Sequence, residues 1–299
     1  MPRSWGLALG AGGLRGAAHV GILKGLRQYR LYPQMVAGSS AGSIIGALYA
    51  VGMPLTEMER HLVSLQRSQV YDTTFTASVL LKMAAKVGWD TLGLPLALSP
   101  DSPLGFIAGD KLEAYVKRLT GGAGFEGLRT PLLITAVDLE NGDPVVFCPQ
   151  AFAHRAADAG WVPLVGYTLA EAVRASTAIP GIFAPKRLDG RLLVDGGLVD
   201  HIPAPVLRHM GLDTVIAVNL LGRKEVVKTD NLLEILVRSM DLMSRELNEV
   251  KLRRAADLVI SPEIGHLGLT DFARLPRLVA AGEEACQALT GEILRIVRE

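Results

Sequence analysis

Residues 35–51 read MVAGSSAGSIIGALYAV, which is an apolar run, a turn of small residues and a helical pattern in that order. We expect a short strand over 35–38 and a helix over 41–51. The turn between them, Gly38-Ser39-Ser40-Ala41-Gly42, fits the G-x-S-x-G pattern, in which a tight turn projects the hydroxyl of the central serine from the edge of a sheet. Side chains at the two glycine positions would collide in such a turn. Ser40 is therefore the candidate nucleophile.

The same five residues allow other interpretations. One alternative is that the motif is a plain turn without a catalytic role, because a chain with 32 glycines can contain G-x-S-x-G by chance. The strand before the turn and the helical pattern Ile44-Ile45-x-x-Leu48 after it favour a nucleophile instead. Ser39 and Ser43 are neighbouring alternatives, but neither has glycine on both sides at the required spacing.

Short apolar runs alternate with helical patterns from end to end, which predicts an α/β fold with a mainly parallel sheet covered by helices. No repeat or low-complexity linker interrupts the pattern, so we expect a single domain over 1–299, with a helical C-terminal part containing one strand over 225–299. Residues 68–106 fit either an ordinary buried helix and loop or a mobile lid over an apolar site. Further strands are expected over 5–9, 132–137, 145–148, 191–194, 214–219 and 258–261, and further helices over 15–28, 110–119, 168–174, 230–254 and from 276.

Local signals mark several boundaries of these elements. Thr56-x-x-Glu59 and Thr168-x-x-Glu171 fit capping boxes that begin helices. Asn141-Gly142 predicts a tight hairpin turn, and Asp189-Gly190 predicts another turn. Between 230 and 254, apolar residues recur at helical spacing, which fits core packing or, as an alternative, contact with a second copy of the chain; they are Leu233, Leu236, Met240, Met243 and Leu247.

Composition excludes some classes of protein. Of the 299 residues, 49% are apolar and 20% charged, so a large core is available. A formal net charge of +1 gives no reason to expect nucleic acid, whose phosphates require a clustered basic surface. No uncharged apolar run approaches the roughly 20 residues that span a bilayer. We expect a cytoplasmic protein with reduced Cys148 and Cys286, and weak peripheral contact with a membrane stays open because mean hydropathy is +0.29.

The N-terminal glycine loop, Gly10-Ala11-Gly12-Gly13-Leu14-Arg15-Gly16, also lies between a predicted strand and a helix. A dinucleotide site would need a third glycine where Arg15 stands and an acidic residue after the next strand, and residues 32–38 contain none. No P-loop Gly-Lys-Ser/Thr follows either. The remaining interpretation is an oxyanion hole, in which backbone N–H groups stabilise a tetrahedral intermediate, each contributing about 3 kcal/mol. Arg15 would brace the loop, lie near anionic head groups, or extend into solvent.

A nucleophilic serine needs a base, and no histidine lies in a recognisable triad context. His201 is the one of interest, because it follows Asp195-Gly196-Gly197-Leu-Val-Asp200. Asp195 ends a predicted strand beside two glycines. A carboxylate in an apolar pocket has its charged form disfavoured, so it becomes basic enough to accept a serine proton. The alternative is a tight Asp-Gly turn without a catalytic role.

Taken together, these motifs resemble the patatin-like phospholipase family, particularly its small bacterial members. The 10–16 loop is similar to the family's oxyanion motif, the 38–42 turn to its nucleophile elbow, and Asp195-Gly196-Gly197 to its Asp-Gly-Gly/Ala motif. The stretches AVDLENG over 136–142 and RASTAIPGIFAP over 174–185 also agree. The resemblance covers roughly residues 5–220.

This resemblance implies a three-layer α/β/α sandwich and a Ser40–Asp195 dyad that works without histidine on glycerolipid or lysolipid esters. It implies backbone amides of Gly12 and Gly13 as oxyanion donors, with Leu14 and Arg15 beside them. The glycines that support the motifs are Gly10, Gly16, Gly38, Gly42, Gly196 and Gly197. Members often carry asparagine just before the position of Pro203, where this chain has Asp200-His201, so His201 is a candidate to assist Asp195.

We therefore expect a serine hydrolase of lipid esters that uses an acyl-enzyme intermediate, with no cofactor and no metal site. Its expected partners are a lipid ester substrate and, transiently, a membrane surface; a homo-oligomer stays open. An acyltransferase built on the same elbow is the alternative, and it would favour His201 as a base. A nucleotide-binding module on the glycine loop is a third hypothesis.

Overall fold

The computed structural model describes residues 3–72, 104–221, 232–265 and 271–298. The apolar runs form a central sheet, described as nine strands within these ranges. They are β1 (Trp5–Leu9), β2 (Met35–Ser39), β4 (Leu132–Asp138), β5 (Pro144–Phe147), β6 (Val162–Leu164), β8 (Lys186–Leu188), β9 (Arg191–Asp195), β10 (Thr214–Val218) and β11 (Leu258–Ile260).

Five neighbouring strands, in the order β11-β10-β1-β2-β4, run parallel to one another. Beyond them β5 pairs with β4 in the antiparallel sense, and β6 follows β5 in parallel. Strand β9 also pairs antiparallel with β4, and β8 with β9. The sheet is thus mainly parallel, as the alternation of strands and helices predicts, and its antiparallel part lies around β9.

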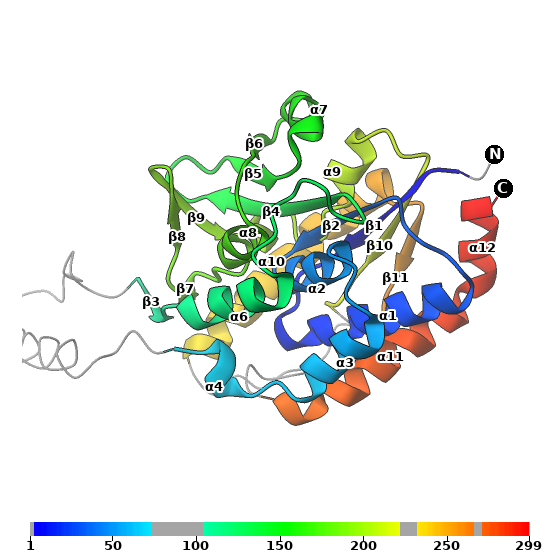
Figure 1. Cartoon of the computed structure of the whole chain (residues 1–299), viewed down its shortest axis with the longest axis horizontal. Coiled ribbons are helices and arrows are strands. Elements are labelled where there is room, and N and C mark those ends of the chain that lie inside the picture. The colour runs from blue at the N-terminus through cyan, green and yellow to red at the C-terminus, as the bar shows by residue number, and fades with distance from the viewer. Residues whose placement is uncertain (1–2, 73–103, 222–231, 266–270, 299) are drawn as a thin grey trace, which may run out of the picture.

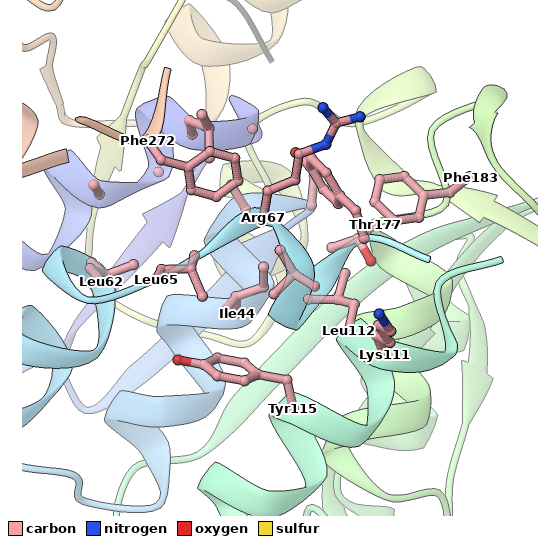
Figure 2. Close-up of a pocket in the computed structure, with 18 of the residues that line it drawn as sticks. Ile44, Leu62, Leu65, Arg67, Lys111, Leu112, Tyr115, Thr177, Phe183 and Phe272 are labelled. Carbon is pink, nitrogen blue, oxygen red and sulfur yellow. The ribbon is translucent and has the colours of Figure 1, made fainter. Parts of the chain in front are cut away.

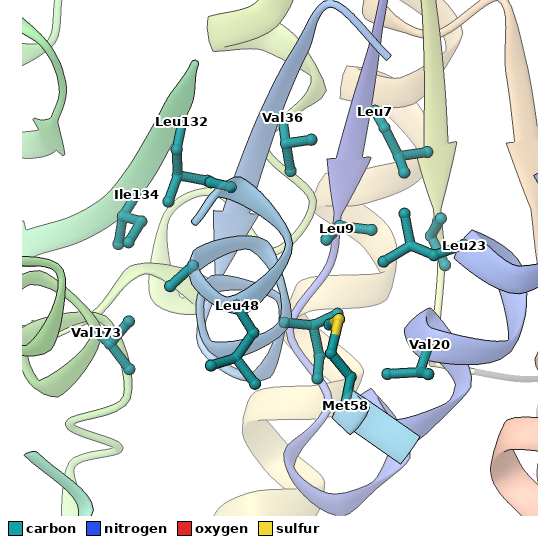
Figure 3. Close-up of a cluster of buried hydrophobic side chains, with 14 of the residues drawn as sticks. Leu7, Leu9, Val20, Leu23, Val36, Leu48, Met58, Leu132, Ile134 and Val173 are labelled. Atoms are coloured by element: carbon teal, nitrogen blue, oxygen red, sulfur yellow. The ribbon is translucent and has the colours of Figure 1, made fainter. Parts of the chain in front are cut away.

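Helices cover both faces of this sheet (Figure 1). Successive strand side chains point to opposite faces, and accordingly Leu7 and Leu9 belong to one buried cluster and Ala8 to the other. On the first face, Leu7 and Leu9 meet side chains such as Val20, Leu48 and Met58 (Figure 3). The helices of that face are α1 (Ala17–Gln28), α2 (Ala41–Ala50), α3 (Leu55–Val63), α6 (Asp110–Thr120), α8 (Leu169–Ser176), α11 (Leu275–Ala288) and α12 (Thr290–Arg298).

The opposite face is covered by α7 (Ala153–Asp158), α9 (Ala204–His209) and the C-terminal part of α10 (Leu232–Ala255). Their buried side chains, Ala156, Leu207 and Leu252 among them, pack on the second cluster. The architecture is therefore a three-layer α/β/α sandwich. The remaining elements are the short helix α4 (Arg67–Val70), the paired strands β3 (Gly105–Ile107) and β7 (Gly181–Phe183), and the 3-10 helices η1 (Gly13–Gly16), η2 (Gln150–Phe152), η3 (Gly196–Leu198) and η4 (Phe272–Arg274).

Two local predictions about helix starts have different outcomes. The capping box at Thr168 is confirmed, because its hydroxyl accepts the N–H of Glu171 and the Glu171 carboxylate accepts the N–H of Thr168. The box at Thr56 is wrong. Helix α3 begins at Leu55, one residue earlier, with Pro54 as its N-cap and Thr56 already inside the first turn. Proline fixes φ near the helical value and its carbonyl accepts the first helical N–H, so it takes the capping position itself.

Other predictions differ in extent. The predicted 15–28 helix begins as the 3-10 turn η1, and the predicted C-terminal helix is two helices, α11 and α12, separated at Leu289. The Asn141-Gly142 hairpin between β4 and β5 is confirmed, with Gly142 at φ 79°. Residues 68–106, for which the sequence allows a buried helix and loop or a lid, are described at their two ends, which form part of α4 and β3. Residues 73–103 lie outside the described residues.

Helix α10 contains the apolar residues that recur at helical spacing between 230 and 254. Met243 is 68% exposed, so it does not pack in the core of this chain. The side chains of Leu233, Leu236 and Leu247 lie outside the described part. Cys148 and Cys286 are free thiols, and the structure shows that both are buried. Among the described residues, no helix combines the length and apolarity that crossing a membrane requires.

Candidate active site

The sheet brings Ser40 and Asp195 together along one edge of β4. Strand β5 pairs with β4 from Ile134 to Val137, so β2 and β9 must both use the opposite edge. There β2 ends with Ser39 paired to Thr135, and β9, running the other way, ends with Asp195 paired to the next residue, Ala136. The C-terminal ends of two strands therefore meet head on at adjacent β4 positions, and Ser40 is the first residue beyond one of them.

The turn at Ser40 has the strained shape that its motif predicts. Its φ is 50° and its ψ is −119°, a combination that non-glycine residues rarely adopt and that costs of order 1–3 kcal/mol. A Cβ at Gly38 would lie 2.5 Å from the carbonyl oxygen of Gly42, and one at Gly42 would lie 2.0 Å from that of Leu9. Both glycines are thus required by close backbone contacts. Helix α2 begins at the next residue, so its positive N-terminal end faces the serine.

Two other serines hold this turn. The backbone N–H of Ser40 donates to Oγ of Ser176, at the C-terminal end of α8, over 2.9 Å. The Ser40 carbonyl oxygen accepts the hydroxyl of Ser43 at 2.6 Å and its N–H at 2.9 Å. Since both backbone groups of Ser40 are bonded, the strained conformation is fixed from two sides.

Asp195 receives two hydrogen bonds, one on each carboxylate oxygen. The hydroxyl of Ser40 donates to Oδ2 at 2.6 Å, and the backbone N–H of Gly197 donates to Oδ1 at 2.7 Å. Asp195 is only 4% exposed. Burial raises its pKa to about 6, although the hydrogen bonds from Ser40 and Gly197 act in the opposite direction. The group remains ionised at pH 7 but is more basic than an ordinary aspartate.

His201 lies close to Gly197, since a Cβ at Gly197 would be 3.3 Å from Nδ1 of the imidazole. Its carbonyl oxygen accepts the N–H of Ala11 at 2.8 Å, which anchors the start of the glycine loop. Burial lowers the pKa of its imidazole to about 4, so the ring is neutral. Among the hydrogen bonds described for 3–72, 104–221, 232–265 and 271–298, none joins this ring to Ser40 or Asp195. The neighbouring Asp200 is fully buried, and its Oδ1 lies 3.7 Å from Nζ of Lys251 on α10.

The glycine loop adopts the 3-10 turn η1 beside Ser40. Gly13 has φ 56°, in the left-handed region that favours glycine. The N–H of Arg15 donates to the Gly12 carbonyl at 3.1 Å, so it is engaged within the loop. The N–H groups of Gly13 and Leu14 stand at the start of this helix, where no preceding turn supplies acceptors. Both residues line the same cavity as Ser40, whereas Gly12 and Arg15 are not among its lining residues.

The side chain of Arg15 braces the loop from outside the cavity. Its guanidinium donates to Oδ2 of Asp241 on α10 at 2.8 Å and to the carbonyl of Leu220 at 3.3 Å. Of the roles that the sequence left open, bracing is the one that these contacts support, and a position near head groups inside the cavity is not observed. His19, on α1, is fully buried, and its Nε2 lies 2.8 Å from the Gly10 carbonyl.

A cavity of about 740 Å³ opens in front of Ser40 (Figure 2). Ligand pockets measure about 300–1,000 Å³, so its size suits a substrate with a hydrocarbon chain. Its walls are mostly apolar, and they come from η1, α1, α2, α3, α4, β3, α6, β7, η4 and α11. The aliphatic part includes Ile44, Leu62, Leu65 and Leu112, the aromatic part includes Tyr115, Phe183 and Phe272, and two cationic residues, Arg67 and Lys111, are also present.

The glycines that support the three motifs lie close to atoms of neighbouring elements, so a side chain would not fit at their positions. A Cβ at Gly16 would lie 2.6 Å from that of Ala41, and one at Gly196 would lie 2.4 Å from the Thr135 carbonyl. A Cβ at Gly10 would lie 2.7 Å from the carbonyl of Val218. The glycine loop therefore lies close against Ala41 and β10, and the loop after Asp195 lies close against β4. In the described residues, no group of three or more His, Cys, Asp or Glu side chains is placed to hold a metal ion.

Sequence reasoning missed Ser176, His19 and the two cavity cations. Ser176 lies in the 174–185 stretch, which was noticed for its resemblance, but nothing local links it to Ser40. His19 lies nine residues after Gly10, a spacing that gives no signal of the contact between them. Arg67 and Lys111 belong to segments without motifs.

A strand–turn–helix with a strained serine, set in an α/β sandwich, defines the class of proteins built around a nucleophile elbow. The family model of patatin-like phospholipases matches residues 7–208. This chain belongs to the patatin-like phospholipase family.

Two curated relatives show how far the similarity extends along the chain. An uncharacterized NTE family protein of Mycobacterium tuberculosis is 33% identical over 217 residues, which is 72% of this chain and 49% of that protein. Patatin-like phospholipase domain-containing protein 6 of Mus musculus is 27% identical over 221 residues, 73% of this chain and 14% of that protein. The chain spans about half the length of the mycobacterial relatives it matches.

Two solved structures share low similarity with the chain. VipD from Legionella pneumophila has a TM-score of 0.47 at 14% identity, covering 97% of this chain and 67% of that one. The type III effector protein ExoU has a TM-score of 0.47 at 17% identity, covering 100% of this chain and 54% of that one.

Proposed function

We propose that this protein hydrolyses acyl esters of lipids, with Ser40 as nucleophile and Asp195 as its base. The observation that carries the proposal is the 2.6 Å hydrogen bond from Oγ of Ser40 to Oδ2 of Asp195 beside a large apolar cavity. Family membership supports lipid hydrolysis in general. The cavity supports a substrate with an acyl chain, because the aliphatic walls would exclude water from it.

In the proposed reaction, Asp195 accepts the proton of Ser40 while Oγ attacks the ester carbonyl. The pKa of Asp195, raised by burial to about 6, makes it a stronger base than an aspartate in water. The oxyanion would accept hydrogen bonds from the N–H groups of Gly13 and Leu14 at the start of η1, with Gly12 adjoining them; in the described part of the chain these two groups have no backbone acceptor. We do not assign the N–H of Arg15 this role, since it donates to Gly12.

Proton transfer from Asp195 to the leaving alcohol oxygen then releases the alcohol and leaves an acyl group on Ser40. A water molecule next gives its proton to Asp195 and attacks the acyl carbonyl. Collapse of the second tetrahedral intermediate releases the fatty acid, and the proton returns to Oγ. His201 takes no part in this proposal, because burial lowers the pKa of its imidazole to about 4, which makes it a weak base, and among the described residues no hydrogen bond joins its ring to Ser40 or Asp195.

Serine labelling with a fluorophosphonate, peptide mapping and turnover of a panel of lipid esters test the proposal. Ser40→Ala should abolish both labelling and turnover, and Asp195→Asn should abolish turnover, while both proteins keep the wild-type circular dichroism spectrum. Ser39→Ala is the matched control, because Ser39 is the adjacent buried serine and its hydroxyl has no partner among the described residues. Ester hydrolysis that persists in Ser40→Ala contradicts the proposal.

The same panel, repeated with added alcohol or thiol acceptors, distinguishes hydrolysis from acyl transfer. We expect the free fatty acid as the main product, and a dominant transfer product would favour the acyltransferase.

Transient contact with a membrane surface is proposed from Phe106, which lines the cavity and is 54% exposed, and from Leu104, which is 56% exposed. Co-sedimentation with phospholipid vesicles tests this contact.

A further inference from the structure

Two residues with permanently charged cationic side chains, Arg67 and Lys111, line the cavity in the described part of the chain. They come from two separate elements: Arg67 is the first residue of α4, and Lys111 lies in the first turn of α6 (Figure 2). The cation of the glycine loop, Arg15, does not join them, because it is paired with Asp241 outside the cavity. The cavity thus combines an apolar body with a pair of positive groups.

The two cations retain donors for a ligand. Lys111 donates one hydrogen bond, from Nζ to the carbonyl of Ser68 at 3.1 Å, and this bond ties α6 to α4. An ammonium group has three N–H donors, so two remain. Within the described residues, the guanidinium of Arg67 has no hydrogen bond or ion pair, and both side chains are exposed.

One carboxylate, Asp72, also lines the cavity, and its oxygens are already occupied. Oδ1 accepts the N–H of Gly109 at 2.7 Å, and Oδ2 accepts the N–H of Lys111 at 3.1 Å. Asp72 therefore caps the start of α6 and is held by backbone donors. Two positive groups against one engaged negative group leave this part of the cavity with a positive potential.

An anion is the ligand that this arrangement suits. A guanidinium presents N–H groups in a fork that matches the oxygens of phosphate or carboxylate, and an ammonium adds a compact charge. A neutral head group would gain neither contact, and a zwitterionic one would bring its own cation toward Arg67. The aliphatic walls that contact an acyl chain are the same for all three.

We propose that Arg67 and Lys111 select, among single-chain lipid esters, those whose head group carries a net negative charge such as a phosphate monoester. This inference rests on the proposed lipid hydrolysis for its catalytic arm, but it also makes a prediction about binding that needs no turnover.

The binding arm uses Ser40→Ala protein and displacement of a fluorescent fatty-acyl probe. Monododecyl phosphate should displace the probe at a concentration at least about 10-fold lower than 1-O-dodecylglycerol, a neutral ligand of equal chain length, because charged hydrogen bonds contribute about 1.5–3 kcal/mol each. The difference should shrink as salt rises, since exposed charges are screened. Inorganic phosphate at the same concentrations should not displace the probe; displacement by it would show a site for the free ion and overturn the lipid assignment.

The variants Arg67→Gln and Lys111→Gln should each reduce the preference for monododecyl phosphate about 3–5-fold, and the double variant should abolish it. Matched controls are Arg60→Gln on the neighbouring helix and Lys117→Gln on the same helix as Lys111, because neither residue lines the cavity. Arg67→Lys should recover part of the preference, which distinguishes loss of charge from loss of fold. Thermal melting verifies that each variant is folded.

The catalytic arm compares kcat/KM for an anionic and a neutral monoacyl ester in wild-type protein and in the double variant. The anionic-to-neutral ratio should exceed about 10 in the wild type and approach one in the variant. A ratio near one in the wild type, or an unchanged ratio in the double variant, overturns the proposal while ester hydrolysis stands. A binding preference without any turnover instead contradicts the proposed function and leaves the anion selectivity in place.

Discussion

The hydroxyl of Ser176 accepts the backbone N–H of Ser40 over 2.9 Å, and both residues are buried. Ser176 ends α8, whereas Ser40 links β2 to α2, so this hydrogen bond ties a helix of one part of the chain to the elbow of another. It satisfies the N–H group of a residue whose φ of 50° takes it out of the regular strand ladder. We regard Ser176 as a positioning residue, because it acts on the proposed nucleophile, Ser40, through the backbone.

Ser176→Ala should lower kcat about 10-fold or more and leave KM nearly unchanged. The substitution leaves the Ser40 N–H buried without an acceptor, which costs about 1–3 kcal/mol of unfolding free energy and loosens the turn. Steady-state kinetics and chemical denaturation measure the two effects. Ser64→Ala, the same change at an exposed helix end, should affect neither quantity. A variant as active as the wild type would show that the turn holds its shape without this bond.

Turnover should rise with pH up to about pH 6 and then level off. In the proposed reaction Asp195 must be a carboxylate to accept the Ser40 proton. Burial raises its pKa to about 6, so below that pH each unit should cost about tenfold in kcat/KM. A rate profile between pH 4.5 and 8.5 measures this limb. Asp200 also has a pKa raised by burial, to about 7, and Asp200→Asn separates the two groups. A limb that disappears in Asp200→Asn would assign the titration to Asp200.

Ser40→Gly should be more stable than Ser40→Ala, by about 1 kcal/mol. Both variants lose the hydroxyl and its bond to Asp195, so they differ in the buried Cβ methyl group, which alanine keeps, and in the freedom of the backbone. Glycine adopts φ 50° with little strain, whereas alanine retains a cost of order 1–3 kcal/mol, partly offset by the greater flexibility of glycine in the unfolded chain. Urea unfolding of the two proteins provides the comparison. An alanine variant that is the more stable of the two would mean that the turn stores no strain.

Arg15 and Asp241 should show a coupling of about 1 kcal/mol in a double-mutant cycle of unfolding free energies. Their side chains are 15% and 18% exposed and lie 2.8 Å apart, so solvent screens them only in part. Arg15→Ala should also lower kcat, because the loop that carries Gly13 and Leu14 loses its brace. The Arg253–Glu249 pair is the control, since at 82% and 71% exposure its coupling should be near zero. Equal coupling in both pairs would argue against a special role for Arg15.

The sequence determined the parts of this site whose shape is local. Glycines two positions before and after Ser40 are readable because a strand-to-helix turn brings Gly38 against Gly42 within a few residues. The place of Asp195 at a strand end, and of the glycine loop between a strand and a helix, follow from equally short-range patterns. The wrong prediction for the start of α3 also concerns a few neighbouring residues. Pro54 and Thr56 are two candidates for one N-cap position, and the backbone of the structure shows that Pro54 takes it.

Tertiary structure alone decided which residues support and surround those parts. Whether Ser176 or another residue accepts the Ser40 N–H, and whether Arg15 turns to Asp241 or to a ligand, depends on how α8 and α10 pack on the sheet. The cavity and its cations likewise arise where helices distant in sequence converge. A turn is fixed by steric limits among neighbouring residues, whereas a packing partner is fixed by the position of whole elements, and no short stretch of sequence records that position.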